Sequence, residues 1–247
     1  MKKILFTLLT VAMFGSMTMA QANKDQRTLT TKIADLLAQM PAKDSVALNT
    51  AMKQVAAMGE KGLINIAVML APPGKGDNTH AEYVINGFSY YTTQPGRERW
   101  RRMSEHALCQ ALAKVEDKIN KAFIISQLQI VAQSDEAVSI LKPYLDDQQL
   151  CDPAARALIK INSSAAKNTL LKALSNSQGT CRLSVVKALG DSRFGAAVAA
   201  ITKLADSKDL MLRKVALNSL ANIANPSSAS LLANAAEKSG YTFESTN

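Results

Sequence analysis

The sequence predicts an all-α protein, namely a solenoid of antiparallel helix pairs. A leucine recurs roughly every 30 residues, as Leu128, Leu158, Leu189 and Leu220. A second recurring position keeps the same spacing and holds Lys121, Cys151, Arg182 and Arg213. A fixed period of this length marks a stack of supersecondary units. Alanine is abundant and aromatic residues are few after Tyr144, which favours closely packed helices over strands.

Residues 1–22 predict a signal peptide that is cleaved from the mature chain. Lys2 and Lys3 form a basic start, residues 4–17 are largely apolar, and Ala20-Gln21-Ala22 provides a small-x-small cleavage site. Cleavage after Ala20 fits nearly as well. A membrane anchor is the alternative, but the stretch falls short of the ~20 apolar residues that a spanning helix needs. We therefore expect a protein of the bacterial periplasm or exterior, with no membrane span after cleavage.

Composition narrows the classes of partner. The 247 residues carry 29 Lys and Arg against 20 Asp and Glu, a formal net charge of +9. A basic exported protein favours anionic glycans, membrane surfaces or acidic proteins. Export argues against nucleic acid as the natural partner. The oligomeric state is not indicated by the sequence.

The sequence contains three cysteines, which are Cys109, Cys151 and Cys181. Cys151 and Cys181 occupy nearly equivalent points of successive units. Equivalent points on stacked helices are about 8–10 Å apart, which is more than the Cα separation that a disulfide tolerates. We therefore expect buried free thiols, with a disulfide as the less favoured alternative.

Residues 23–119 predict an irregular helical N-terminal part of the solenoid. Apolar residues at helical spacing predict helices over residues 23–39, 46–58, 81–91 and 103–115. The apolar run 63–70 favours a further helix, with a short buried strand as the alternative. Residues 71–78 read as a loop, in which Gly74-Lys75-Gly76 lacks the spacing and the following Ser or Thr of a phosphate-binding loop.

Residues 120–240 predict about four regular units. Small or polar breaks end the first helices near Gln133, Asn162, Gly190 and Asn225. Second helices follow over residues 136–145, 165–174, 196–205 and 229–236, each with one apolar face. Residues 241–247 read as a tail or the start of a truncated further unit. Because solenoids need a polar capping helix and none is evident, we expect a fragment of a longer protein.

Residues 212–226, with the sequence LRKVALNSLANIANP, resemble a HEAT repeat of the armadillo-like class. Ala188-Leu189-Gly190-Asp191 matches in part, whereas Cys151 stands where the repeat has arginine. Residues 123–130 and 150–157 are similar to a group of exported bacterial HEAT proteins, some of which continue into a sugar-cleaving domain of the 3-keto-disaccharide hydrolase type. The resemblance implies a non-catalytic scaffold that binds proteins or ligands. It also implies an alternative, an accessory region of a larger glycan-degrading enzyme.

The densest positive cluster is predicted to bind the partner. It consists of Arg97, Arg99, Trp100, Arg101 and Arg102. Arginine and tryptophan dominate interface hot spots, and arginine pairs with carboxylates. The alternative is a solvated helix start with Trp100 turned into the core.

The recurring residues of the units favour a structural role. Leu128, Leu158, Leu189 and Leu220 are predicted to fill the core. Arg182 and Arg213, together with Lys121, form either a basic ladder for an anionic partner or, as we prefer, structural residues. The structural interpretation has these arginines hold neighbouring turns through acids such as Asp206 or Asp209.

The sequence predicts no catalytic, cofactor or metal site. His80 and His106 are the only histidines, and neither lies in an HExxH motif. No serine lies in a Gly-x-Ser-x-Gly elbow, and no motif pairs two acids as general acid and base. We therefore expect a protein that is not an enzyme.

Overall fold

The computed structural model describes residues 25 and 27–240. Within this part of the chain the regular elements are α-helices and short 3-10 helices, and no strand occurs. The prediction of an all-α fold is confirmed for these residues. The predicted signal peptide and the residues 241–247 lie outside the described part.

The elements follow one another along the whole described chain. In order they are α1 (Leu29–Leu37), α2 (Ser45–Val68), α3 (Thr79–Thr92), α4 (Glu98–Lys114), α5 (Lys118–Val131), α6 (Asp135–Leu141), η1 (Lys142–Asp146), α7 (Cys151–Ile161), α8 (Ser164–Asn176), α9 (Gly179–Asp191), η2 (Gly195–Ala197), α10 (Val198–Thr202), α11 (Leu210–Ile223), η3 (Pro226–Ser228) and α12 (Ala229–Lys238).

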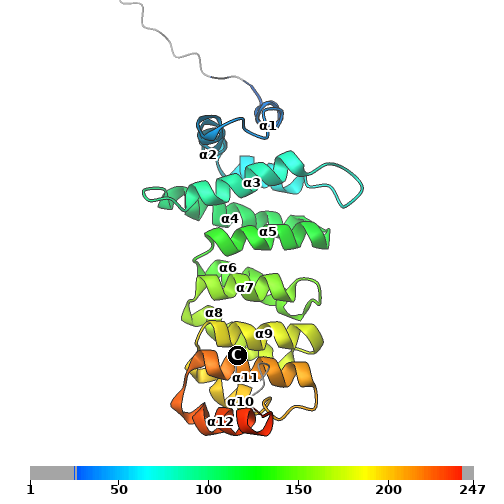
Figure 1. Cartoon of the computed structure of the whole chain (residues 1–247). Coiled ribbons are helices and arrows are strands. Elements are labelled where there is room, and N and C mark those ends of the chain that lie inside the picture. The colour runs from blue at the N-terminus through cyan, green and yellow to red at the C-terminus, as the bar shows by residue number, and fades with distance from the viewer. Residues whose placement is uncertain (1–24, 26, 241–247) are drawn as a thin grey trace, which may run out of the picture.

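The helices stack into an elongated array (Figure 1). Alternate helices contact one another, so that α1, α3, α5, α7, α9 and α11 form one row, called here the first row. Helices α2, α4, α6 and α8 form a second row, and α10 and α12 pack against α11. Each helix thus contacts its neighbours in the stack, which is the architecture of an α-solenoid.

The N-terminal helices α1 to α4 continue both rows. Helix α2 covers two predicted segments, because Gly59 adopts φ 67° and kinks the chain between them. Glycine tolerates this conformation since it has no Cβ. Residues 63–70 are therefore helical up to Val68, and the strand alternative is wrong.

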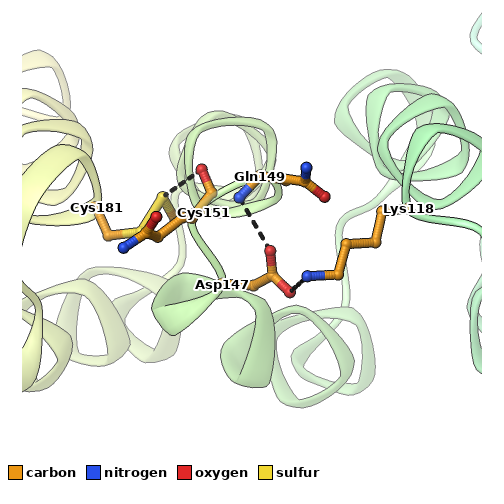
Figure 2. Close-up of a disulfide and its surroundings, with 6 residues drawn as sticks. Lys118, Asp147, Gln149, Cys151 and Cys181 are labelled. Atoms are coloured by element: carbon orange, nitrogen blue, oxygen red, sulfur yellow. Dashed lines mark hydrogen bonds and ion pairs between the residues drawn. A yellow bond between two sulfur atoms is a disulfide. The ribbon is translucent and has the colours of Figure 1, made fainter.

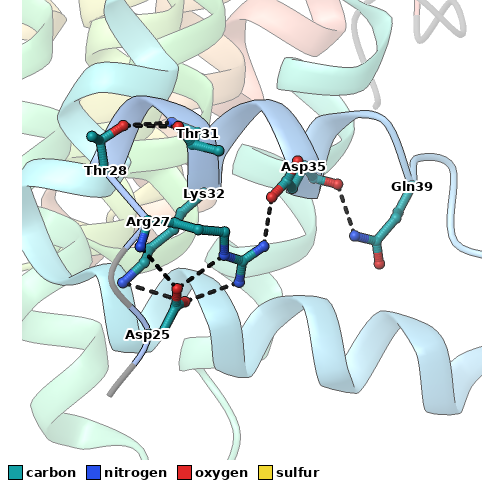
Figure 3. A network of polar contacts seen from close by, with 7 residues as sticks. All are labelled: Asp25, Arg27, Thr28, Thr31, Lys32, Asp35 and Gln39. Carbon is teal, nitrogen blue, oxygen red and sulfur yellow. Dashed lines mark hydrogen bonds and ion pairs between the residues drawn. The ribbon is translucent and has the colours of Figure 1, made fainter. Parts of the chain in front are cut away.

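A polar network fastens the start of α1 (Figure 3). Asp25 accepts hydrogen bonds from Arg27 and lies 3.4 Å from the ammonium of Lys32. Arg27 also donates to Asp35, which lies in the second turn of α1. The Arg27 guanidinium holds the pKa of the Asp25 carboxyl below its usual range. These groups are exposed, so solvent screens the pairs and their contribution to stability is small.

The breaks between helices carry N-cap side chains. The caps of α5, α6, α8 and α11 are Asp117, Ser134, Ser163 and Asp209, and each side chain accepts a backbone N–H of the first turn. Such caps satisfy N–H groups that have no partner within the helix. The polar breaks seen in the sequence therefore both stop one helix and start the next.

The four recurring leucines lie in the core as predicted. Leu128, Leu158, Leu189 and Leu220 are all 0% exposed. They sit on α5, α7, α9 and α11, which are successive helices of the first row. Burying each leucine contributes about 1.5–3 kcal/mol.

Gly190 has a role that differs from the predicted helix break. It lies inside α9, which ends at Asp191. An added Cβ at Gly190 would lie 2.6 Å from the Cα of Ser219 on α11. The Ser219 hydroxyl donates to the Val186 carbonyl at 3.0 Å, so the two helices meet here at very short range. The glycine permits this close approach, and the chain leaves the helix one or two residues later.

Cys151 and Cys181 form a disulfide, so the prediction of free thiols is wrong for this pair (Figure 2). Their Cα atoms are 5.4 Å apart. The expected separation of about 8–10 Å joins helix axes, whereas each Cα lies about 2.3 Å from its own axis. Cα atoms on facing sides are therefore closer than the axes. Cys109 is free and buried, as expected.

An ion pair accompanies the disulfide at the same end of the helices (Figure 2). Asp147, in the turn before α7, lies 2.7 Å from the ammonium of Lys118 at the start of α5. Asp147 also accepts the backbone N–H of Gln149 at 2.9 Å. The lysine holds the pKa of the Asp147 carboxyl below its usual value. Helices α5, α7 and α9 are thus linked in series at one end.

Candidate binding surfaces

The predicted arginine cluster opens α4, and two of its members bind the protein's own backbone. Arg97 lies 3.5 Å from the centre of the Tyr91 ring and donates to the Tyr91 carbonyl at 3.0 Å. Arg101 donates to the Val131 carbonyl at 2.9 Å and to the Ile130 carbonyl at 3.3 Å. These carbonyls end α5, where helical partners are missing. Both guanidinium groups therefore have a structural role within the protein.

Glu105, one turn beyond Arg101 on α4, binds the start of the next helix. Its Oε1 accepts from the backbone N–H groups of Gln133 and Ser134 and from the Ser134 hydroxyl, at 2.6 to 3.0 Å. Helix α4 therefore caps the C-terminus of α5 and the N-terminus of α6 with opposite charges, as helix dipoles favour. No sequence motif singles out Glu105. The only signal is its spacing of i+4 from Arg101, which places both on one face.

The remaining cluster residues offer a partner a smaller binding surface than the sequence suggests. Trp100 is half-buried and packs against the core, and the guanidinium of Arg99 lies 5.1 Å from the centre of its ring. Arg99 and Arg102 are exposed. Partner binding by the cluster stays a prediction, and it concerns chiefly these two arginines.

The recurring basic residues do not pair with the expected acids. Lys121 lies 5.6 Å from the Tyr144 ring centre, and the half-buried Arg182 has an Nε without a partner among residues 25 and 27–240. Asp209 caps α11 instead of holding Arg213. Neither Arg182 nor Arg213 forms an ion pair in the described part of the chain. The structural role that we preferred for Arg213 therefore lacks its expected contact.

Arg213 instead lines an open groove of about 910 Å³ at the C-terminal end of the array. We call it the terminal groove. Its large apolar residues are Leu210, Leu217 and Leu231, from α11 and α12. Arg213 and Lys238 place positive charge beside these leucines, and Asp206 is the one acid of the lining. No residue of α12 is fully buried, so this last helix keeps much of its surface open.

A histidine joins three helices of the second row. His106 Nδ1 on α4 lies 2.9 Å from Glu60 on α2, and its Nε2 lies 3.6 Å from Glu136 on α6. Gln110 donates to the same Glu60 oxygen at 2.8 Å. The hydrogen bond to Glu60 raises the pKa of His106. The cluster is polar and partly exposed, and it couples neighbouring helices.

Two features are absent from the part of the chain that the structure describes. Among residues 25 and 27–240, no group of three or more His, Cys, Asp or Glu side chains is arranged to hold a metal ion. No helix of this part is long and apolar enough to cross a membrane.

Comparison with known families supports the repeat architecture. Residues 168–243 match the family model described as HEAT repeats. No significant match was found among curated proteins. The matched residues include α9, α11 and α12, and therefore both helices that line the terminal groove. The match and the helical fold together support a HEAT-like helical repeat protein.

Proposed function

We propose that this protein is an exported, non-catalytic scaffold of HEAT-like antiparallel helix pairs that binds a partner protein in the terminal groove. HEAT repeats generally mediate protein–protein interaction, which is compatible with this role. Repeat arrays bind by presenting side chains from successive units on one extended surface.

The terminal groove is the observation that carries the proposal. It combines exposed leucine surface with the guanidinium of Arg213, which has no ion-pair partner among residues 25 and 27–240. Leu210 is 54% exposed. An apolar floor with charge at its rim is the usual anatomy of an interface. The partner that fits is an amphipathic segment with acidic residues, since opposite charge steers association. A second copy of this basic chain fits less well, because like charges would meet.

The disulfide supports export. Disulfides persist in oxidising compartments and are rare in reducing ones. Cys151–Cys181 therefore fits the periplasm or the exterior, where a chain with the predicted signal peptide would be delivered. The alternative, an accessory region of a glycan-degrading enzyme, draws no support from the comparisons.

Site-specific photo-crosslinking in the native host tests the proposal. Asn234, an exposed residue of the groove, is replaced by benzoylphenylalanine, and Asn168 on α8 is the matched exposed control. We expect a defined adduct with a protein from position 234 only. Arg213→Glu should abolish that adduct, because it reverses the charge that receives the partner. Equal adducts at both positions, or an adduct that survives Arg213→Glu, would contradict the proposal.

A further inference from the structure

A second groove, of about 540 Å³, crosses three helices of the first row. Helices α3, α5 and α7 lie side by side there (Figure 1). We call it the amide groove, because three carboxamide side chains line it. Its polar residues are Asn86 and Tyr90 from α3, Ser126, Gln127 and Gln129 from α5, and Lys160 from α7. The volume falls within the range of small-ligand sites, about 300–1,000 Å³.

The lining of the amide groove is polar but hardly charged. Carboxamides offer both donors and acceptors, and the hydroxyls of Ser126 and Tyr90 do the same. No carboxylate lines the groove, and Lys160 carries its only charge. Ile130 is the only aliphatic residue of the lining. Such a surface suits a ligand rich in hydroxyl groups better than an apolar side chain or an alkyl chain.

Gln127 supplies a buried acceptor that lacks a partner. It is 4% exposed, and its Oε1 has no hydrogen bond among residues 25 and 27–240. Its Nε2 donates to the Ser126 hydroxyl at 3.1 Å, and that hydroxyl donates to the Phe123 carbonyl at 2.6 Å. This chain of bonds fixes which end of the carboxamide is nitrogen. A buried acceptor without a donor is costly, and this cost falls if the Gln127 side chain turns its Oε1 toward a hydroxyl or N–H of a molecule in the groove.

Tyr90 supplies an aromatic surface beside these groups. It is 59% exposed and lies four residues after Asn86, so both lie on one face of α3. An exposed tyrosine offers a flat apolar ring together with a polar tip. The C–H face of a sugar ring packs on such a surface while its hydroxyls bond to carboxamides. Tyrosine and carboxamide on neighbouring helices therefore match the two kinds of surface that a sugar presents.

We propose that the amide groove binds an oligosaccharide. Tyr90 receives the apolar face of one sugar ring. The Gln127 side chain turns toward the groove on binding, and its Oε1 then accepts a hydrogen bond from a sugar hydroxyl. Lys160 lies where it favours a sugar that bears a carboxylate. This site is separate from the terminal groove, and it does not depend on the protein partner proposed there.

Calorimetric titration of the full chain tests the proposal with defined probes. The probes are cellotetraose, chitotetraose and tetragalacturonate. We expect at least one to bind with a Kd of about 1 mM or tighter. Tyr90→Ala and Gln127→Leu should each weaken that binding about tenfold, because they remove the stacking surface and the acceptor. Gln149→Leu, two residues before α7 and at the end away from Lys160, is the control and should leave binding unchanged.

Folding of each variant is checked by thermal melting, and NMR provides a second readout on the unaltered chain. Binding should shift the side-chain amide signals of Asn86, Gln127 and Gln129. Failure of all three probes to bind up to about 10 mM, or shifts confined to other residues, would overturn the proposal. Binding that survives both Tyr90→Ala and Gln127→Leu in folded protein would also overturn it. If Lys160→Ala leaves tetragalacturonate binding unchanged, the role of Lys160 is wrong.

Discussion

At the residue scale, several charged side chains join neighbouring units. Arg101 and Glu105 lie on one helix and bind the backbone on both sides of the α5–α6 turn. The sequence presents Arg101 as one of four arginines in a row of six residues. Its contact is with Val131, thirty residues further along the chain. Only the folded structure distinguishes the role of Arg101 from that of its exposed neighbours.

Arg101→Ala should lower stability, whereas Arg102→Ala should leave it nearly unchanged. Arg101 donates to two carbonyls at the end of α5, and Arg102 is exposed. Hydrogen bonds from a charged donor are worth about 1.5–3 kcal/mol, and partial exposure places the expected loss near the lower end. Thermal melting of the two matched variants measures the difference. Equal melting temperatures would contradict the capping role.

The His106 cluster should make stability depend on pH. Glu60 raises the pKa of folded His106, so protonation favours the folded state. This gain in stability is fully present below the pKa of histidine in the unfolded chain, about 6.5. It is lost as the pH rises through the pKa of His106 in the folded protein. Because the His106 side chain is 43% exposed, solvent screening keeps the gain below about 1 kcal/mol. Melting of wild type and His106→Gln should differ more at about pH 5.5 than at about pH 8.5. A difference independent of pH would contradict this.

At the scale of the element, the spacing of α9 and α11 is set by Gly190. The first helix of each unit carries a buried leucine, but the contact of α9 with α11 also needs Gly190. Sequence patterns identify the glycine and suggest a break. They do not show that the backbone of another helix passes over it. Helical periodicity describes one helix at a time, so it does not predict the distance between two helices.

Gly190→Ala should destabilise the protein, although alanine is the better helix former. The new Cβ would meet the Cα of Ser219 at 2.6 Å, and backbone cannot turn aside as a side chain can. Overpacking of this kind costs about 1–3 kcal/mol, which lowers the melting temperature by several degrees. Gly195→Ala is the matched control, since its Cβ would meet nothing within 4 Å. Equal melting temperatures of the two variants would contradict the close contact between Gly190 on α9 and Ser219 on α11.

At the scale of the whole molecule, stability is a sum over units and their contacts. The disulfide Cys151–Cys181 adds a covalent link between α7 and α9 in the middle of this series. The same region holds the Lys118–Asp147 pair, so α5 is tied to the turn before α7. Linked units unfold together more readily than separate ones.

Removing the disulfide should lower stability by about 2–4 kcal/mol, because the cross-link restricts the unfolded chain. The measurement is thermal melting of the Cys151→Ser/Cys181→Ser variant. Dithiothreitol should lower the melting temperature of the wild type but not that of the double variant. Under denaturing, non-reducing conditions one thiol should react, Cys109, whose pKa burial raises to about 12 in the folded state. Three reactive thiols would contradict the disulfide.

The sequence by itself determines the all-α class, the period of the array, the buried leucines and most helix positions. These features follow from local propensity and from a hydrophobic pattern that repeats along one chain. The tertiary structure alone decides the disulfide, the caps of Arg101 and Glu105, the contact at Gly190 and the two grooves. Most of these features join residues from different units, roughly 30 positions apart, and all of them depend on distances between helix surfaces. A one-dimensional pattern gives the order of the helices, whereas these distances arise only when the helices pack.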